Sequence, residues 1–247
     1  MINCLILFYG GWPKHLDGKA IDYKRVYTEV EKATITDESN RNDATIDNNA
    51  TTKEIRYLLK QYQKDGVKKY LVAAENGIRY LLKAQYKNGG WPQYYPDLSS
   101  YRHEITYNDN AMINALNVLY DVVKRKDEFA VVDTALVSFA DKAIKKGVEC
   151  ILKTQIKVKG RLTAWCAQYD EVSLKPAGAR KFELISISGS ESVGIVEFLM
   201  KVEKPSNEIK NAIEKLEKTG IIRYYKHSNK FNFLIMFIYL FGVAKID

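Results

Sequence analysis

The sequence has few cysteines, and their arrangement excludes two classes of protein. Its three cysteines are Cys4, Cys150 and Cys166, an odd number without close spacing. This argues against a disulfide framework and against a zinc site. Cys150 falls in an apolar helical pattern, so we expect it to be a small core residue.

Apolar stretches long enough for a membrane span are also lacking. Residues 1–9 are apolar but have no basic region and no cleavage site, so no signal peptide is recognisable. The run at 231–243 is too short to cross a bilayer, which takes about 20 residues. We therefore predict no membrane partner and expect this run to be a buried helix or a divergent end.

Blocks of like charge are absent, although the chain is basic overall, with a net charge of +8 and a pI near 9.1. The lysines are scattered along the chain, which is typical of a solvated surface. An acidic polysaccharide and a nucleic acid would each suit this charge, and charge alone does not separate them. Without a basic block, we predict no nucleic-acid partner.

Two short strings occur twice, which indicates a repeated helix–loop unit. IRYLLK occupies 55–60 and 78–83, and GGWP occupies 10–13 and 89–92. Apolar periodicity predicts further helices, and we expect capping boxes at Thr51 with Glu54 and at Ser188 with Glu191. The segments 28–50 and 158–189 are expected to be long loops. The predicted class is all-α, with a first helix behind Thr51 marked by Ile55, Leu58, Leu59 and Tyr62, and further helices near 67–86, 108–125, 128–157, 190–202 and 206–219.

The stretch from Asn88 to Met112 carries the clearest functional signal. It holds two glycines, a tryptophan, two prolines and four tyrosines, and it ends with Asn108, Asp109 and Asn110 at a predicted helix start. Rigid aromatic rings beside oxygen ligands suit the binding of a sugar chain against a hard cation. Similar polar strings follow: AWCAQYD at 164–170, ARKFE at 179–183 and SISGSES at 186–192.

Together these strings resemble polysaccharide lyase family 10, the pectate lyases, over about residues 10–217. The resemblance implies an (α/α) toroid whose long loops form a groove on one face. It also implies one catalytic domain over 1–247 that is incomplete, because family members continue with a segment that residues 219–247 do not match. We therefore expect the chain to diverge at both ends.

The same resemblance implies a function. The expected reaction is cleavage of de-esterified polygalacturonate by calcium-assisted β-elimination, which gives 4,5-unsaturated oligogalacturonides. The cofactor would be Ca²⁺ and the partner polygalacturonate, bound by a monomer. The expected location is extracellular or periplasmic.

The resemblance also assigns the reacting residues. Asp47 and Asp109 would bind the metal, with Asn110 in place of a more usual acidic residue. Arg180 would be the base that takes the C5 proton, although pairing with a substrate carboxylate is an alternative role. Without the resemblance, both aspartates are equally explained as turn or helix-cap residues.

Six further residues are predicted to contact substrate, and each has a plainer alternative. Aromatic residues are more often core than binding platform, and polar residues beside glycine and proline often shape turns. The six are Trp91, Tyr94, Tyr95, Trp165, Gln168 and Asp170.

Two other functions compete with the lyase. A toroidal glycoside hydrolase would use two carboxylates, for example Asp109 and Asp170. A non-catalytic remnant that binds acidic glycan is the alternative from a different class, favoured by the unusual C-terminal sequence. A new C=C bond in the product would separate the lyase from both.

Overall fold

The computed structural model describes residues 10–16, 19–21, 25, 28–36, 42–218, 225–227 and 230–232. Cys4 and most of the apolar run at 231–243 lie outside these ranges. In the described part, no helix is long and apolar enough to cross a membrane.

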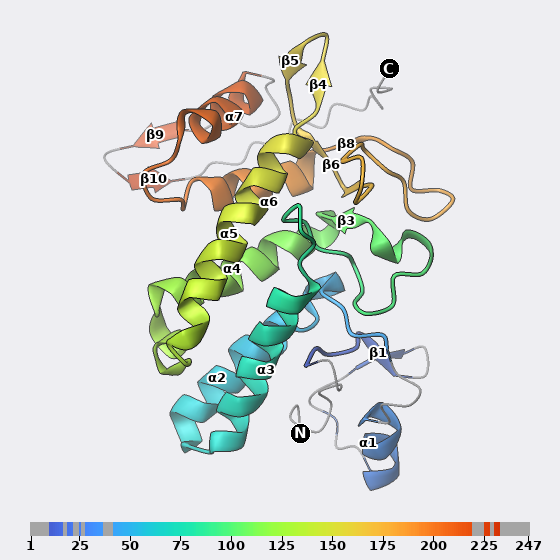
Figure 1. Cartoon of the computed structure of the whole chain (residues 1–247), viewed down its shortest axis with the longest axis vertical. Coiled ribbons are helices and arrows are strands. Elements are labelled where there is room, and N and C mark those ends of the chain that lie inside the picture. Colours follow the sequence, from blue (N-terminus) through green and yellow to red (C-terminus); the bar gives the residue numbers. More distant parts are fainter. Residues whose placement is uncertain are drawn as a thin grey trace.

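Helices make up most of the described structure, and six of the seven described α-helices, all but the first, pack as three consecutive pairs (Figure 1). The first two pairs are hairpins, and the last two helices pack on the middle pair. The helices are α1 (Glu29–Thr36), α2 (Thr52–Asp65), α3 (Lys68–Ala84), α4 (Ala111–Lys124), α5 (Ala135–Thr154), α6 (Gly189–Leu199) and α7 (Asn207–Glu217).

Short β-strands join the loops between these helices, in five two-stranded antiparallel sheets. β3 pairs with β7 and β6 with β8, so each of these two sheets ties together loops far apart in the sequence. The strands are β1 (His15–Leu16), β2 (Lys19–Ala20), β3 (Ile105–Thr106), β4 (Lys157–Val158), β5 (Arg161–Leu162), β6 (Trp165–Cys166), β7 (Gln168–Tyr169), β8 (Ile187–Ser188), β9 (Tyr225–His227) and β10 (Lys230–Asn232).

The predicted all-α class and the predicted (α/α) toroid are therefore wrong. Strands of two or three residues are too short to produce an alternating pattern, which is why the sequence did not predict them. The described helix pairs lie in a row, with α6 and α7 packed on α4 and α5, and they do not close a ring (Figure 1).

Six predicted helices are confirmed, although the helix expected at 128–157 begins only at Ala135, and three local predictions are wrong. The capping box expected at Ser188 is absent, because its hydroxyl donates to the Glu191 carboxylate and makes no cap hydrogen bond to the backbone. The expected loop at 28–50 contains α1. The expected capping box at Thr51 is absent, because its hydroxyl donates to Thr45 O at 2.8 Å and accepts from Trp12 N at 3.0 Å. That hydroxyl thus fixes the GGWP loop instead of the helix end.

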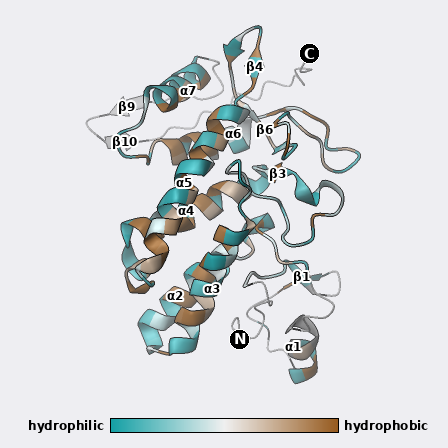
Figure 2. Cartoon of the chain, in the orientation of Figure 1, coloured by the Kyte–Doolittle hydropathy of each residue, from teal (hydrophilic) through white to brown (hydrophobic). Residues whose placement is uncertain are grey.

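The core lies where apolar helix faces meet. Figure 2 shows hydrophobic and hydrophilic bands side by side on α2, α3 and α5, as expected for amphipathic helices. Ile55 and Leu58 of α2 and Ile78 and Leu81 of α3 are fully buried. Cys150 of α5 is also a buried free cysteine, which confirms its expected core position.

Tryptophan side chains tie the loops to the ends of two helices. Trp91 Nε1 donates to Leu81 O of α3 at 2.7 Å, and Trp165 Nε1 donates to Ile151 O of α5 at 2.8 Å. Both acceptors belong to the last four residues of a helix, whose carbonyls have no partner within the helix. The two hydrogen bonds occupy equivalent places in the repeated unit.

A glutamine follows each of these two helices and joins it to the next pair. Gln85 Nε2 donates to Gly89 O at 3.0 Å and to Ala143 O of α5 at 2.9 Å. Gln155 Nε2 donates in the same way to Thr163 O at 2.9 Å and to Ala212 O of α7 at 3.1 Å. The helix–loop unit expected from the repeated strings is thus present, and it places successive loops on one side of the helices.

Candidate active site

The loops of successive units meet at a small, strongly polar cavity of about 100 Å³, here called the polar pocket. It brings together three predicted site residues that are far apart in the sequence, namely Asp47, Asp109 and Arg180. The residues that line it are Lys14, Asp47, Asn48, Gln93, Tyr94, Tyr101, Asn108, Asp109, Gln168, Arg180 and Glu183.

Two similar turns supply the aspartates. The 3₁₀ turns Asp47–Asn49 and Asn108–Asn110 precede α2 and α4, and they contact each other. Asn48 (φ 48°) and Asp109 (φ 52°) are in the left-handed region, which Asn and Asp adopt more readily than other residues with a side chain. The backbone therefore explains the Asp–Asn composition of both turns, and their contact brings the two carboxylates into one pocket.

Lys14 and Asn48 link the two turns. Lys14 Nζ forms an ion pair with Asp47 Oδ2, and the Asp47 side chain is only 5% exposed. In the amide orientation that satisfies both neighbours, the Asn48 amide oxygen accepts from Lys14 Nζ at 2.7 Å and its amide nitrogen donates to Asp109 Oδ2 at 3.3 Å. The Lys14 ammonium group therefore pairs directly with one predicted metal ligand and is linked to the other through the Asn48 amide.

The electrostatic setting of Asp109 favours a cation. Partial burial raises the pKa of this carboxyl, and the negative charges of Asp47 and Glu191 raise it further. Lys14 acts in the opposite direction and lowers the pKa. Because Glu191 begins α6, each of the three units contributes one carboxylate to this region.

Arg180 lies at the exposed side of the pocket and is paired with Glu183. Glu183 Oε2 accepts from Arg180 Nε and from Arg180 N, each at 3.0 Å, and Oε1 accepts from Nη2. This pairing raises the pKa of Arg180 and lowers the pKa of Glu183. The guanidinium is therefore fully protonated in this structure.

Two of the predicted substrate contacts, Tyr94 and Gln168, line the pocket. The Arg102 guanidinium lies 4.6 Å from the Tyr94 ring centroid, and burial raises the pKa of Tyr94 to about 12. Gln168 is buried in β7. Tyr95 is half-buried and packs edge-on against Tyr80, with 6.1 Å between the ring centroids.

Tyr95 does not line the polar pocket, and the remaining three predicted substrate contacts also lie elsewhere. Trp91 and Trp165 are 0% exposed, so their rings face the core and offer no surface for a sugar, contrary to expectation. Asp170 Oδ1 accepts from Val172 N at 3.2 Å and from Ser173 N at 2.6 Å, which makes it a turn residue. Asp170 is not among the residues that line the polar pocket.

Several pocket residues were missed because their sequence context gave little signal. Lys14 and Gln93 each follow a GGWP string, so the repeat itself could have indicated that both reach the same place. Tyr101 carries no comparable signal, and Glu183 lies in the ARKFE string without any sign of a role of its own. Their positions depend on how the loops fold over the helix ends.

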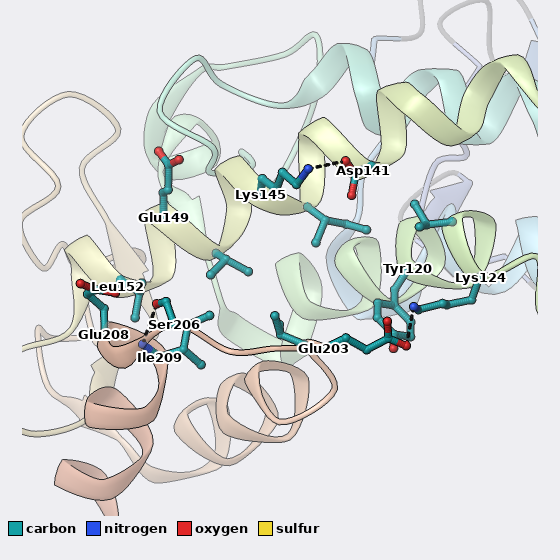
Figure 3. Close-up of a pocket in the computed structure, with 14 residues that line it drawn as sticks. Tyr120, Lys124, Asp141, Lys145, Glu149, Leu152, Glu203, Ser206, Glu208 and Ile209 are labelled. Atoms are coloured by element: carbon teal, nitrogen blue, oxygen red, sulfur yellow. Dashed lines mark hydrogen bonds and ion pairs between the residues drawn. The ribbon is translucent and has the colours of Figure 1, made fainter.

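A larger cavity, of about 640 Å³, lies between α4, α5 and the start of α7 (Figure 3). Its wall is mostly apolar, and two lysines at its rim are paired. Lys124 bonds Glu203 at 2.6 Å, and Lys145 bonds Asp141 at 2.7 Å. Cavity size therefore does not select the candidate site, because the smaller pocket holds the predicted site residues.

The described residues contain no group of three or more His, Cys, Asp or Glu side chains arranged to hold a metal ion. A cation in the polar pocket would therefore take two carboxylates, Asp47 and Asp109, together with neutral oxygens. This donor set suits a hard cation that prefers oxygen ligands.

Comparisons with known proteins found a matching family model and similar solved structures. The family model described as pectic acid lyase matches residues 7–227. A mutant of the family 10 polysaccharide lyase from Cellvibrio cellulosa, solved in complex with trigalacturonic acid, is 34% identical with a TM-score of 0.77. Another structure of the family 10 lyase from that organism is 33% identical with a TM-score of 0.74.

Both alignments cover 88% of this chain but only 64% of the solved chain. No match is found among curated proteins. The family match spans most of the sequence, including every residue that lines the polar pocket. The chain therefore belongs to the pectic acid lyase family, that is, to polysaccharide lyase family 10.

Proposed function

We propose that the protein is a pectate lyase that cleaves de-esterified polygalacturonate by calcium-assisted β-elimination. The observation that carries this proposal is the convergence of Asp47, Asp109 and Arg180 on one polar pocket. The related lyase solved with trigalacturonic acid supports the substrate class. The products would be 4,5-unsaturated oligogalacturonides.

The pocket residues fit a calcium ion. Asp47 and Asp109 offer carboxylate oxygens, and Gln93 Oε1 is buried without a hydrogen-bond partner. An unpartnered buried oxygen is costly, so this carbonyl is a suitable neutral ligand. Bound calcium would withdraw charge from the substrate carboxylate next to C5 and so make the C5 proton more acidic.

Arg180 is the proposed base. Its neutral form would take the C5 proton, the electron pair of that C–H bond would form the C4=C5 double bond, and the C4–O bond would break, with the leaving oxygen taking a proton from water. A guanidinium is protonated at neutral pH, so the site must favour its neutral form transiently. Lys14 lies in the same pocket, and a nearby positive charge lowers the pKa of a cationic group.

The remaining pocket residues are proposed to orient the sugar chain. Tyr94 is a neutral hydroxyl donor on a ring held by Arg102, and Gln168 is a buried amide in a short strand. Both can bond sugar hydroxyls without adding negative charge beside a polyanion. We propose that the protein acts on this polymer as a monomer, in an extracellular or periplasmic setting.

The test uses polygalacturonate, calcium and three proteins, which are the wild type, Arg180→Lys and Asp47→Ala. We expect the wild type to produce the ultraviolet absorbance of a new C=C bond, and each variant to lose at least about 100-fold in kcat. Glu203→Gln, which removes an exposed ion pair away from the pocket, is the matched control. New reducing ends without absorbance would indicate a hydrolase, and no cleavage at all would indicate a non-catalytic protein.

A further inference from the structure

We propose that Glu183 is a positioning residue that sets the orientation of Arg180 at the polar pocket. This inference rests on the proposed function, in which Arg180 is the base. The Glu183 carboxylate accepts hydrogen bonds from the main-chain N and the side-chain Nε of Arg180, each at 3.0 Å, and also from Arg180 Nη2. One carboxylate therefore fixes both the backbone and the side chain of the reacting residue.

The main chain around the pair is closed into a turn. Glu183 N donates to Arg180 O at 2.7 Å, and Ala179 N donates to Glu183 O at 3.2 Å. Ala177 N donates to Gln168 O at 2.9 Å, which ties the start of the turn to a residue that lines the polar pocket. The turn that carries Arg180 is thus anchored to the pocket wall.

Space at the turn is also restricted. A Cβ at Gly178 would lie 2.9 Å from Glu183 O, closer than side-chain carbons approach a carbonyl. Glycine at this position therefore lets the loop close tightly around the Arg180–Glu183 pair. The close approach and the hydrogen bonds describe the same compact turn.

The side chain of Arg180 needs this restraint because it is 56% exposed. A long exposed side chain samples many rotamers, and a misplaced base loses much of its catalytic effect. The Glu183 carboxylate occupies the Nε and Nη2 edge of the guanidinium. Arg180 Cζ lies over the Phe182 ring, 4.9 Å from the ring centroid. The Nη1 end is thus left as the part outside the ion pair.

Glu183 has a second effect that a purely structural residue would not have. Its negative charge stabilises the protonated guanidinium, so its removal should make the neutral base easier to form. A Glu183→Gln variant should therefore hold the Arg180 side chain less precisely, and yet Arg180 should reach its neutral, active form at lower pH. These opposite effects on kcat and on the pH profile distinguish positioning from a fold defect.

The first arm of the test measures kcat and KM on polygalacturonate as a function of pH for full-length wild type, E183Q and E183D. We expect E183Q to lose at least about tenfold in kcat, to change KM less than about threefold, and to move its acidic limb to lower pH. E183D keeps the charge and should recover part of kcat without the shift. Values for E183Q equal to those of the E203Q control would overturn the proposal.

The second arm does not depend on activity. Nitrogen-15 NMR of arginine Nε–H groups, with Arg180 assigned by its loss in Arg180→Lys, should show a slowly exchanging signal that becomes fast in E183Q. If the wild type does not cleave polygalacturonate, the proposed function fails but this signal still tests the pair. An Arg180 signal unchanged in E183Q would overturn the positioning role even in an active enzyme.

Discussion

Replacing Lys14 with methionine should tighten calcium binding, because the ammonium group of Lys14 occupies the place where a cation would sit. Lys14 Nζ is paired with Asp47 Oδ2 and lies 2.7 Å from the Asn48 amide oxygen. A calcium ion that uses these oxygens must first displace the ammonium. Methionine keeps most of the length of the side chain and removes only the competing charge.

The size of the effect follows from the burial of this ion pair. The Asp47 side chain is 5% exposed and that of Lys14 is 23% exposed, so solvent screens the pair only weakly. Hydrogen bonds to charged groups contribute about 1.5–3 kcal/mol. Since 1.4 kcal/mol corresponds to a factor of ten, Lys14→Met should lower the calcium Kd roughly ten- to a hundred-fold.

Calcium titration of the wild type, Lys14→Met and Lys124→Met by calorimetry would measure this change. Lys124 pairs with Glu203 at the apolar cavity, so its variant controls for the loss of one positive charge. Lys14→Met should also raise KM for polygalacturonate if the ammonium binds a substrate carboxylate once calcium is present. Weaker calcium binding in Lys14→Met would refute the competition argued here.

Three further predictions address the fold and the chemistry. Gly147→Ala should lower the free energy of unfolding by about 1–2 kcal/mol, measured by denaturant unfolding, because the new Cβ would lie 2.6 Å from Leu116 Cδ2. This overpacking outweighs the helix propensity that alanine adds. Ser138→Ala on the exposed side of α5 is the control. Asp109→Asn should raise the Tm of the calcium-free protein at neutral pH. The pKa of Asp109 is raised in the folded protein, so its stabilising contribution is present at low pH and is lost as the pH rises through that pKa. Asparagine stays neutral and avoids this loss. An unchanged or lower Tm would contradict this pKa direction. Asp170→Ala should change kcat less than about threefold, because its carboxylate bonds only its own turn, whereas a hydrolase that used it would lose nearly all activity.

The helices could be predicted from the sequence because their signal is local and periodic. Ile55, Leu58 and Leu59 recur on one face of α2, and all three are buried. The two-residue strands could not be predicted, since pairing such as Ile105 with Tyr169 depends on loops that meet only after folding. The toroid was inferred from resemblance alone, without any local signal in these residues.

The candidate site also contains residues that could be predicted from the sequence and residues that could not. Asp47 and Asp109 could be found because the strings around them resemble those of the family, whereas the residues alone fit a turn or helix cap equally well. Glu183 belongs to the ARKFE string, but its role could not be found, because that role depends on contact with Arg180 within a folded turn. Trp91 and Trp165 were placed in the groove by resemblance, yet the repeated unit uses both indole nitrogens to cap helix ends.

The most direct test of the proposed calcium-assisted elimination is the ultraviolet absorbance of the product, measured while calcium is removed and restored. Polygalacturonate is incubated with the full-length chain in calcium, then in excess chelator, then in restored calcium. The proposal predicts that formation of the C=C bond stops in chelator, returns with calcium, and is absent in Asp47→Ala under all three conditions. Undiminished absorbance in chelator would contradict it.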